Sequence, residues 1–266
     1  MHKNKTQKMI DILVSLEPVF ECAGKLALEL RKTTKSYNKF DTGIYGVDIV
    51  TDADVAIQEM VLAEMAKTDL VECKLFAEES SHYVDKFKET NGLVLTLDPI
   101  DCTFVYVSTG RFFSIIVCLN DGKSPIYTYY HYPVVKFTRR IIYNQVQDFG
   151  KFPQVDIKNN LDLSHTISTF GHPEKTVPDI YKKLIDRGYI FRDLPEITDE
   201  SGSCTLFFLN HTAGYYTENI GVYDGLCGYH YAKAKKMEII SDFDMSEAKM
   251  GSHGFYYPGW YFVLRK

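Results

Sequence analysis

Apolar residues in this chain follow two patterns, short continuous runs and longer stretches with helical spacing. Between residues 10 and 30 they recur every three or four positions, which predicts a core helix, and Pro18 is placed to start a second helical segment. Residues 93–97 form a short, branched run after Asn91-Gly92, which predicts a buried strand. Strand-like runs separated by turn signals predict a meander at residues 112–119, 126–132 and 137–143.

The second half of the chain repeats this alternation. Residues 166–170 predict a strand, residues 174–187 a helix that ends before Gly188, and residues 205–209 a buried element. The polar, glycine-containing stretch 35–45 predicts a loop. Helices and strands mixed in this way indicate an α/β, or layered α+β, fold. We expect one compact unit with an N-terminal part, residues 1–145, and a C-terminal part, residues 146–266.

Two carboxylates follow the strand predicted at residues 93–97. The sequence L-D-P-I-D-C-T at residues 97–103 places Asp98 and Asp101 three positions apart, with Pro99 between them. Ligands in open α/β folds bind beyond the carboxyl ends of strands, and clustered carboxylates suit hard cations such as Mg²⁺. An ordinary turn with Asp101 as a helix N-cap explains the same residues, and D-P-x-D alone favours that simpler interpretation.

Other acids also allow both structural and functional interpretations. Thr51-x-x-Asp54 precedes apolar residues at helical spacing, which is typical of a capping box, so Asp54 has a structural explanation too. Glu78 and Glu79 follow a short apolar pair that would end a strand. Because adjacent strand residues point to opposite sides, at most one of the two is expected to bind a metal ion directly. An exposed acidic loop is the alternative.

Four stretches, taken in order, resemble the inositol monophosphatase family. They are V-D-I-V-T-D-A-D at residues 47–54, F-A-E-E-S at 76–80, D-P-I-D-C-T at 98–103 and V-Y-D-G-L-C-G at 222–228. The family patterns are V-D-x-V-T-x-x-D, G-E-E-S, D-P-I/L-D-G-T and W-D-x-A-A-G. Four ordered motifs are far more specific than any one of them.

The resemblance implies an αβαβα sandwich, a homodimer, and catalysis with two or three bound Mg²⁺ ions. It implies that Asp54 pairs with Thr103 to orient the attacking water, with Glu79 close to that water. The implied metal ligands are Glu78, Asp98, the carbonyl of Ile100, Asp101 and Asp224. The residues implied to contact the substrate are Asp101, Cys102, Thr103, Gly202, Ser203, Cys204, Glu218 and Asp224.

The most consequential departure from the family patterns is Cys102, which replaces the usual glycine of D-P-I-D-G-T. A side chain there interferes if the position needs a positive φ or a very close phosphate approach. If only the backbone N–H is used, Cys102 is tolerable. A thiol nucleophile has no adjacent histidine to support it.

Other departures lie in the loops and in the late motifs. Gly43 stands at the offset of a family loop lysine, and Lys39 is the nearest lysine but inherits no role. Tyr223 and Leu226-Cys227 replace the usual tryptophan and alanines, and Glu218 lies one position closer to Asp224 than the family spacing requires. For the segment that starts at Gly202, a simple loop entering a buried element is an equally good explanation.

Composition narrows the range of partners. The 266 residues are 45% hydrophobic and 24% charged, which is enough for a full core, and the net charge of −5 disfavours a nucleic-acid polymer as partner. An anionic substrate then needs a local cationic site, which bound metal supplies. No apolar run approaches a membrane span and no secretory segment follows Met1, so we expect a soluble, cytoplasmic protein with no membrane partner. The six cysteines are expected to be free thiols.

The resulting hypothesis is a magnesium-dependent phosphomonoesterase that acts on a small phosphorylated alcohol similar to inositol monophosphate. The same chemistry on 3′-phosphoadenosine 5′-phosphate, histidinol phosphate or fructose 1,6-bisphosphate is the alternative. A pseudoenzyme that binds metal or a sugar phosphate is the alternative of another class, motivated by the departures. The presence of every motif acid speaks against the pseudoenzyme.

Overall fold

The computed structural model describes residues 2–38, 49–108, 110–246, 248–251 and 254–266. Its first sheet has the strand order β3-β4-β5-β6-β7-β8. β3 is parallel to β4, and each later strand is antiparallel to the one before it, which confirms the predicted meander. The strands are β3 (Lys74–Ala77), β4 (Val94–Asp101), β5 (Ser114–Asn120), β6 (Pro125–Tyr132), β7 (Phe137–Ile142) and β8 (Gln145–Phe149).

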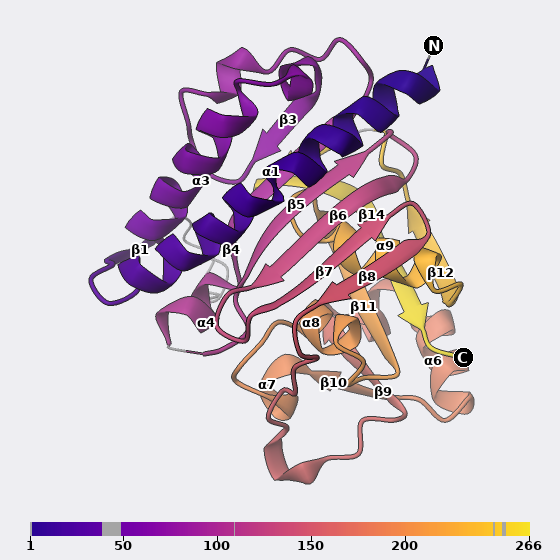
Figure 1. The fold of residues 1–266 in the computed structure, drawn as a ribbon. Coiled ribbons are helices and arrows are strands. Elements are labelled where there is room, and N and C mark those ends of the chain that lie inside the picture. The colour runs from indigo at the N-terminus through magenta and orange to yellow at the C-terminus, as the bar shows by residue number, and fades with distance from the viewer. Residues whose placement is uncertain (1, 39–48, 109, 247, 252–253) are drawn as a thin grey trace.

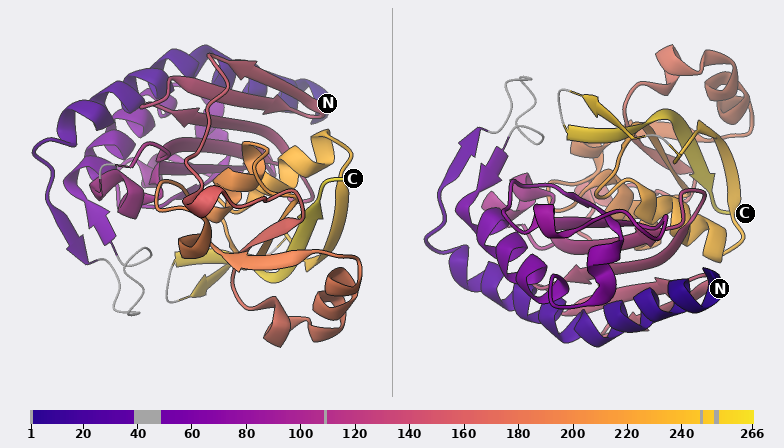
Figure 2. Two further views of the ribbon diagram at one scale, coloured as in Figure 1. Left: turned by 90° about the horizontal axis from the view of Figure 1, so that it is seen from below. Right: turned by 90° about the horizontal axis from the view of Figure 1, so that it is seen from above.

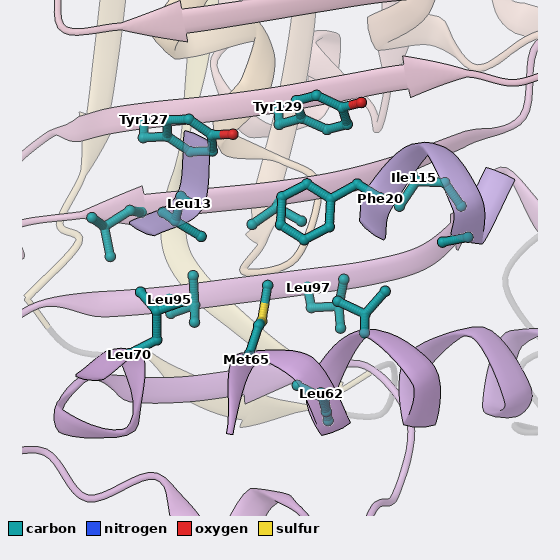
Figure 3. Packing of buried hydrophobic residues seen from close by; sticks show 14 of the residues in the cluster. Leu13, Phe20, Leu62, Met65, Leu70, Leu95, Leu97, Ile115, Tyr127 and Tyr129 are labelled. Atoms are coloured by element: carbon teal, nitrogen blue, oxygen red, sulfur yellow. The ribbon is translucent and has the colours of Figure 1, made fainter. Parts of the chain in front are cut away.

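Two long helices, α1 (His2–Leu30) and α3 (Asp52–Met65), cover the outer face of the first sheet (Figure 1). Leu13 and Phe20 of α1 and Met65 of α3 are fully buried against strand residues of that sheet (Figure 3). Each such side chain contributes about 1.5–3 kcal/mol when it is removed from water. This layer therefore fixes α3, and with it Asp54, against the sheet.

Pro18 lies inside α1 and does not start a second helix, contrary to the sequence prediction. The buried residues Leu13 and Phe20, on either side of it, pack into one core cluster. Pro18 itself is exposed, so the carbonyl that loses its helical hydrogen bond can be hydrated. Packing along the sheet thus keeps one continuous helix across the proline.

The second sheet has the order β10-β9-β11-β14-β12, with β13 paired to β14. The neighbours β10, β9 and β11 are parallel to one another, and β14 is antiparallel to β11 and β12. Its strands are β9 (Thr166–Phe170), β10 (Ile190–Asp193), β11 (Gly214–Gly221), β12 (Glu238–Phe243), β13 (Lys249–Gly251) and β14 (Gly254–Leu264).

Helices α8 (Ser203–Phe208) and α9 (Leu226–Ala234) lie between the two sheets, and α5 (Pro173–Thr176) and α6 (Pro178–Asp186) lie next to the second sheet on its outer side (Figure 2). Neighbouring residues of β11 point to opposite faces of the second sheet. Tyr215 packs into the hydrophobic core between the two sheets, whereas Tyr216 packs with Leu184 of α6 on the outer face. The layers are therefore helix, sheet, helix, sheet, helix, which is the predicted αβαβα architecture.

Local sequence accounts for the remaining differences from prediction. The helix expected at residues 174–187 is two helices, because Pro178 lacks an N–H and starts α6. Gly188, which follows the C-cap residue Arg187 of α6, has φ of +90°, as expected for the C-terminal end of that helix. The run at 205–209 falls largely in α8, and residues 36–38 of the predicted loop form a strand. The short elements are β1 (Ser36–Asn38), β2 (Ile49–Thr51), α4 (Thr103–Val107), α7 (Leu194–Ile197) and three 3₁₀ turns, Asp69–Glu72, Val84–Lys86 and Lys158–Asn160.

Strand β8 extends the first sheet to Phe149, slightly past the division expected at residue 145, and the division into two parts stays a prediction. Among the helices in the described ranges, none is long and apolar enough to cross a membrane.

Candidate active site

The carboxyl end of β4 turns two acids toward one region. On a regular strand, Asp98 and Asp101 would point to opposite faces because they are three positions apart. The pairing of β4 with β5 shifts register between these two residues, which re-aims the chain. Asp98 Oδ1 accepts a hydrogen bond of 3.0 Å from the backbone N of Ile100, closing a turn around Pro99.

Two hydroxyl groups from neighbouring strands hold Asp101. Its Oδ2 accepts hydrogen bonds from Ser114 Oγ of β5 (2.7 Å) and from Tyr130 OH of β6 (2.6 Å). The sequence analysis assigned neither residue a role, because nothing local connects positions 101, 114 and 130. The register of the sheet is the missing signal, since it pairs Asp101 with Ser114 and Ile116 with Tyr130.

Four carboxylates from three distant segments meet at this edge. Glu78 follows β3, Asp98 and Asp101 end β4, and Asp224 follows β11. Burial first, and then the charges of Glu78, Asp101 and Asp224, raise the pKa of Asp98 well above its ordinary value. Glu78 also lies within hydrogen-bonding distance of Asp98. The structure therefore places the four predicted acidic metal ligands within electrostatic reach of one another, from motifs up to 146 positions apart in the sequence.

Asp224 occupies the open side of this cluster. Crowding by protein atoms, followed by the charges of Asp101 and Glu78, raises its pKa to about 7. Asp224 is nevertheless exposed, so water moderates the shift. Gly221 leaves room for Asp224, since a Cβ at that glycine would lie 2.3 Å from Asp224 Oδ1.

Hard-cation chemistry fits this set of donors. The strongest charge effects on Asp98 and Asp224 all come from other carboxylates, so the cluster has a strong excess of negative charge. Carboxylate and carbonyl oxygens are the ligands that Mg²⁺ prefers. Within the described ranges, no three acidic, histidine or cysteine side chains are already drawn together around an ion position. That the four acids and the carbonyl of Ile100 hold such an ion stays a prediction.

Asp54 and Thr103 form the second predicted pair. Asp54 is the N3 residue of α3, where its Oδ2 accepts from the backbone N of Thr51 (2.8 Å) in a complete capping box. Thr103 Oγ1 lies 3.4 Å from its Oδ1 and 3.0 Å from the carbonyl oxygen of Ile100, so the single proton of that hydroxyl is shared between two acceptors. Both the structural and the functional interpretation of Asp54 therefore agree with its position.

Glu79 lies beside this pair. Burial is the main reason that the pKa of Asp54 is raised to about 6, and the charge of Glu79 adds to it against the hydrogen bonds from Thr51. The backbone of Glu79 is fixed by the side-chain amide of Gln58, which accepts from its N at 2.9 Å and donates to its O at 2.6 Å. Residues 78 and 79 lie just past β3 and act on different neighbours, Asp98 and Asp54; which of them binds a metal ion stays a prediction.

Cys102 adopts the left-handed conformation, with φ of 63° and ψ of 52°, directly before α4. The position therefore does need a positive φ, and the cysteine carries a backbone cost that glycine would avoid. The side chain fits because a Cβ at Gly202 would lie only 2.6 Å from Cys102 Sγ. Burial and the charge of Asp101 raise the pKa of the Cys102 thiol well above its usual range, which adds to the lack of an adjacent histidine as evidence against a thiol nucleophile.

The late segment is only partly assembled as the resemblance implied. Gly202 faces Cys102 at the start of α8, but Ser203 Oγ donates to the carbonyl of Thr169 at 3.0 Å. Cys204 packs against Gly228, where an added Cβ would lie 3.1 Å from its Sγ. Both side chains of this segment, those of Ser203 and Cys204, are thus engaged inside the protein, and the substrate contacts of all three residues stay predictions.

Glu218 is engaged with the loop after β9. Its Oε1 accepts from the backbone N of His172 at 3.3 Å, and its Oε2 accepts from Tyr216 OH at 2.7 Å and from Thr176 Oγ1. Its substrate role also stays a prediction.

Gly43 and Lys39, which bear on the family's loop lysine, lie outside the described residues, as does Asp48 of the first motif.

Arg31 supports the site from behind and was missed by the sequence analysis. Its guanidinium donates to the carbonyls of Val105 (2.9 Å), Tyr106 (2.6 Å) and Gly110 (2.8 Å), at and beyond the end of α4. Tyr106 OH donates in return to the carbonyl of Ala27 at 2.9 Å. The end of α1 is thus tied to the short helix that begins with Thr103.

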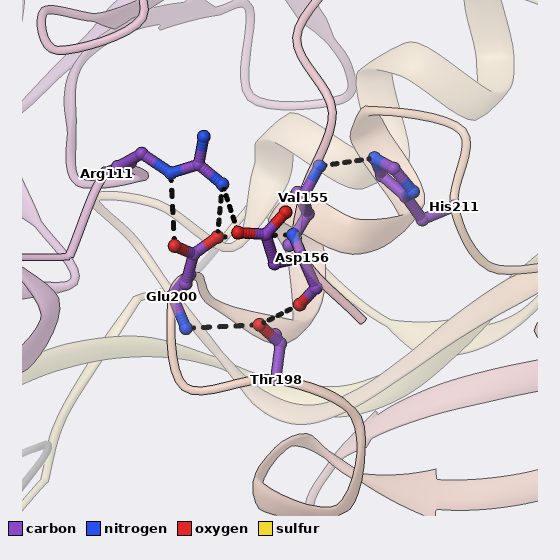
Figure 4. A network of polar contacts seen from close by, with 6 residues as sticks. All are labelled: Arg111, Val155, Asp156, Thr198, Glu200 and His211. Carbon is purple, nitrogen blue, oxygen red and sulfur yellow. Dashed lines mark hydrogen bonds and ion pairs between the residues drawn. The ribbon is translucent and has the colours of Figure 1, made fainter. Parts of the chain in front are cut away.

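A second polar network holds the segment before Gly202 (Figure 4). Arg111 forms two hydrogen bonds with Glu200, at 3.1 and 2.7 Å, and an ion pair with Asp156 at 2.9 Å. The backbone N of Phe112 donates to the carbonyl of Glu200 at 3.2 Å. This network joins the approach to β5 to the approach to α8, and so helps to keep Gly202 opposite Cys102.

The sequence model of the inositol monophosphatase family matches residues 13–187. The chain belongs to the inositol monophosphatase family. This family consists of phosphatases, which identifies the acid cluster as the candidate active site of a phosphatase. The match ends before Gly202 and Asp224, whose placement rests on the fold. No curated protein matches the chain.

Solved structures of inositol monophosphatases (IMPases) share this fold. An IMPase of Thermotoga maritima is 20% identical, over 95% of this chain and 92% of that chain, with a TM-score of 0.63. An IMPase/NADP phosphatase, complexed with Mg²⁺ and phosphate, is 17% identical over 98% and 92%, with a TM-score of 0.66. A staphylococcal IMPase-I, complexed with products, is 18% identical over 98% and 91%, with a TM-score of 0.64.

Replacing Cys102 tests the backbone cost at this position. We expect Cys102→Gly to be more stable than Cys102→Ala by about 1 kcal/mol, because only glycine adopts the left-handed conformation freely. Cys22 is the matched control: it is exposed in helix α1, where alanine should be more stable than glycine by about 1 kcal/mol. Urea unfolding of the four variants measures both differences. The same order at both positions would contradict the strained assignment of Cys102.

The raised pKa of Asp224 predicts a pH-dependent cost in the metal-free protein. A carboxyl with a raised pKa stabilises the fold while protonated and loses that contribution as the pH rises from about 4 toward 7. Asp224→Asn should therefore become progressively more stable than the wild type between pH 5 and pH 7.5.

The comparison with the wild type is essential because His131 and His230 act in the opposite direction. Burial lowers the pKa of each to about 4, so their contribution is lost as the pH falls below about 6.5. They are common to both proteins and cancel in the difference. Urea unfolding with a chelator present makes the measurement, and a constant difference across this range would refute the prediction.

Proposed function

We propose that this chain is a magnesium-dependent phosphomonoesterase that hydrolyses a small phosphorylated alcohol. The observation that supports it most is the convergence of four carboxylates next to the Asp54–Thr103 pair. A fixed excess of negative charge favours a bound divalent cation, and a bound cation in turn lets an anionic phosphate approach acidic residues.

In this proposal Glu78, Asp98, the carbonyl of Ile100, Asp101 and Asp224 hold two or three Mg²⁺ ions. Bound magnesium would supply charge stabilisation and a lowered pKa for the attacking water. Ser114 and Tyr130 orient Asp101 by donating to Oδ2, and its Oδ1 accepts a 3.5 Å hydrogen bond from the Cys102 thiol, a weak donor that a bound ion could displace. Asp98 Oδ1 is likewise engaged within the protein, because it accepts from the backbone N of Ile100.

Asp54 and Thr103 would position the attacking water. Thr103 Oγ1 lies between a carboxylate that accepts its proton and the carbonyl of Ile100, so its lone pairs are available to a water that approaches from the site. Asp54, with a pKa raised to about 6, is suited to take up a proton near neutral pH, and Glu79 lies close enough to influence it. The backbone N–H groups of Cys102 and Thr103 would bind phosphate oxygens.

The substrate class rests on comparison. Solved relatives of this fold are described with inositol monophosphate and with 2′-AMP bound. We therefore retain an inositol monophosphate-like alcohol as the first choice, with 3′-phosphoadenosine 5′-phosphate, histidinol phosphate and fructose 1,6-bisphosphate as alternatives. Homodimerisation and a cytoplasmic location stay predictions.

Phosphate release from these four substrates, with and without Mg²⁺, tests the proposal. We expect magnesium-dependent turnover of at least one. Asp98→Asn should lower it by about 10²- to 10³-fold or more, because one acid that serves the cations is lost. Asp121→Asn, the same change in the turn after β5, should leave turnover unchanged. Absence of turnover, with Mg²⁺ binding intact, would instead support the binding-protein alternative.

Arg31→Met tests whether the end of α1 positions Thr103. Loss of three hydrogen bonds to the end of α4 should lower kcat about 10- to 100-fold with little change in KM, because small misplacements of reacting groups are costly. Arg31→Lys should recover part of the loss, since it keeps the charge and three donors. Arg187→Met, which breaks an exposed pair with Glu238, is the control. If Arg31→Met lowers thermal stability but leaves kcat unchanged, Arg31 stabilises the fold and does not position Thr103.

A further inference from the structure

The thiol of Cys102 lies among the acids of the candidate active site. Its Sγ donates a hydrogen bond of 3.5 Å to Asp101 Oδ1, the carboxylate oxygen that the two hydroxyl donors do not hold. After burial, the charges of Asp101, Asp98 and Asp224 act on this thiol, in that order. Three of the four predicted acidic metal ligands are therefore within electrostatic reach of the sulfur. The family pattern has glycine at this position, so the sulfur is a property of this chain.

The thiol is held in place and stays accessible. Residue 102 has a left-handed backbone conformation, and its side chain lies against Gly202, where an added Cβ would be 2.6 Å from Cys102 Sγ. Cys102 is only partly buried, so an ion from solvent can reach its sulfur. Cys204, which is also partly buried, packs against Gly228 instead. Cys102 is therefore the thiol best placed to contact an ion at the acid cluster.

The distance between this sulfur and its oxygen partner matches that between two ligands of one zinc ion. Zinc lies about 2.3 Å from thiolate sulfur and about 2.0–2.2 Å from carboxylate oxygen, with tetrahedral angles, so two such ligands are about 3.6 Å apart. Cys102 Sγ and Asp101 Oδ1 are 3.5 Å apart. Octahedral magnesium, with bonds of about 2.0–2.1 Å, places neighbouring ligands only about 2.9 Å apart. A tetrahedral ion can therefore take the place of the thiol proton without moving either atom.

Binding of such an ion exchanges a proton for a metal. The S–H bond breaks, the proton leaves to solvent and a metal–sulfur bond forms, with no change of oxidation state. Without metal, the neighbouring carboxylates disfavour a thiolate at Cys102. A divalent cation reverses their effect, because its charge is the largest in the site and a coordinating thiol is deprotonated outright. The same acids that keep the thiol protonated therefore attract the ion that replaces its proton.

The sulfur changes which ion the cluster favours. Carboxylate and carbonyl oxygens suit Mg²⁺, whereas thiolate selects softer ions such as Zn²⁺. An added thiolate therefore strengthens the binding of Zn²⁺ and contributes nothing to the binding of Mg²⁺.

We propose that Cys102 turns part of the acid cluster into a mixed sulfur and oxygen site for Zn²⁺ or a similarly soft divalent cation. Its ligands are Cys102 Sγ and Asp101 Oδ1, with Asp224 as a third ligand from the open side. Because Asp101 would also serve Mg²⁺, the two ions compete, and the softer ion inhibits by occupying a ligand that the reaction needs. The binding does not depend on hydrolysis, whereas the inhibition rests on the proposed phosphatase function.

Cadmium absorption tests the sulfur contact without any substrate. Cd²⁺ bound by a thiolate absorbs in the ultraviolet through sulfur-to-metal charge transfer. The parent protein is Cys22→Ser, which removes the exposed thiol of α1. We expect this absorption when Cd²⁺ is titrated into the metal-free parent, and its loss when Cys102→Ser is added. Cys204→Ser, the same change at the start of α8, should retain it.

Two results would overturn the sulfur contact. They are no charge-transfer absorption in the parent protein, and absorption that persists after Cys102→Ser. If serine destabilises the fold, Cys102→Gly repeats the measurement, because glycine adopts the left-handed conformation freely.

Competition with a chromophoric chelator measures the affinity for Zn²⁺, and calorimetry measures the affinity for Mg²⁺. Cys102→Ser should weaken Zn²⁺ binding about 100-fold or more, because even the loss of an outer-shell partner costs about 10- to 100-fold. Mg²⁺ binding should change less than about threefold, because Mg²⁺ does not use the sulfur. Equal weakening of both ions would overturn the selectivity.

An inhibition measurement separates this inference from the phosphatase proposal. If a substrate is turned over, Zn²⁺ should inhibit the Mg²⁺-dependent reaction, and more Mg²⁺ should relieve the inhibition. Cys102→Gly should raise the Zn²⁺ concentration for half inhibition about 100-fold. An unchanged concentration would overturn the inhibitory role even with the phosphatase confirmed. If no substrate is turned over, the cadmium and chelator measurements still decide whether the sulfur site exists.

Discussion

Repulsion among carboxylates is the constraint on which the site depends. Glu78, Asp98, Asp101 and Asp224 each lose solvation or gain a like-charged neighbour when the chain folds, and the raised pKa values of Asp98 and Asp224 express that cost. Nothing in the cluster itself favours its assembly. The remainder of the fold must therefore supply the energy that holds the acids together, and two hydrophobic cores on opposite faces of the first sheet do so.

The supporting contacts come from elements that are remote in sequence but adjacent in space. Ser114 and Tyr130 fix Asp101 through the register of the first sheet, and Arg31 reaches α4 from the far end of α1. Arg111 joins the region before β5 to the segment before α8. Each contact acts on a backbone carbonyl or on a carboxylate oxygen, so it fixes the position of the chain or of an acid.

The sequence predicted the parts of this site that have local signals. The capping box at Thr51 and Asp54 and the strand before Asp98 depend on neighbours within a few positions. Pro18 misled because tertiary packing on both sides of it outweighs one lost helical hydrogen bond. Tyr130 and Arg31 could not be recognised, because their partners lie 29 and up to 79 positions away and a tyrosine or an arginine carries no local mark of its future contact. No single motif was specific enough to identify the acids of the site, but the four motifs in order were.

Cys102 and Gly202 show how one departure constrains another part of the chain. A left-handed residue at position 102 is needed to turn the backbone from β4 into α4, and the cysteine accepts this conformation at a cost in backbone energy. Its thiol then occupies the space that a Cβ at position 202 would need. Position 202 therefore has to be a glycine, because any side chain there would collide with the Cys102 thiol. The Arg111 network holds this glycine in place. Any substitution that enlarges residue 202 would press on Cys102 and, through it, on Asp101 and Thr103, its neighbours in the chain.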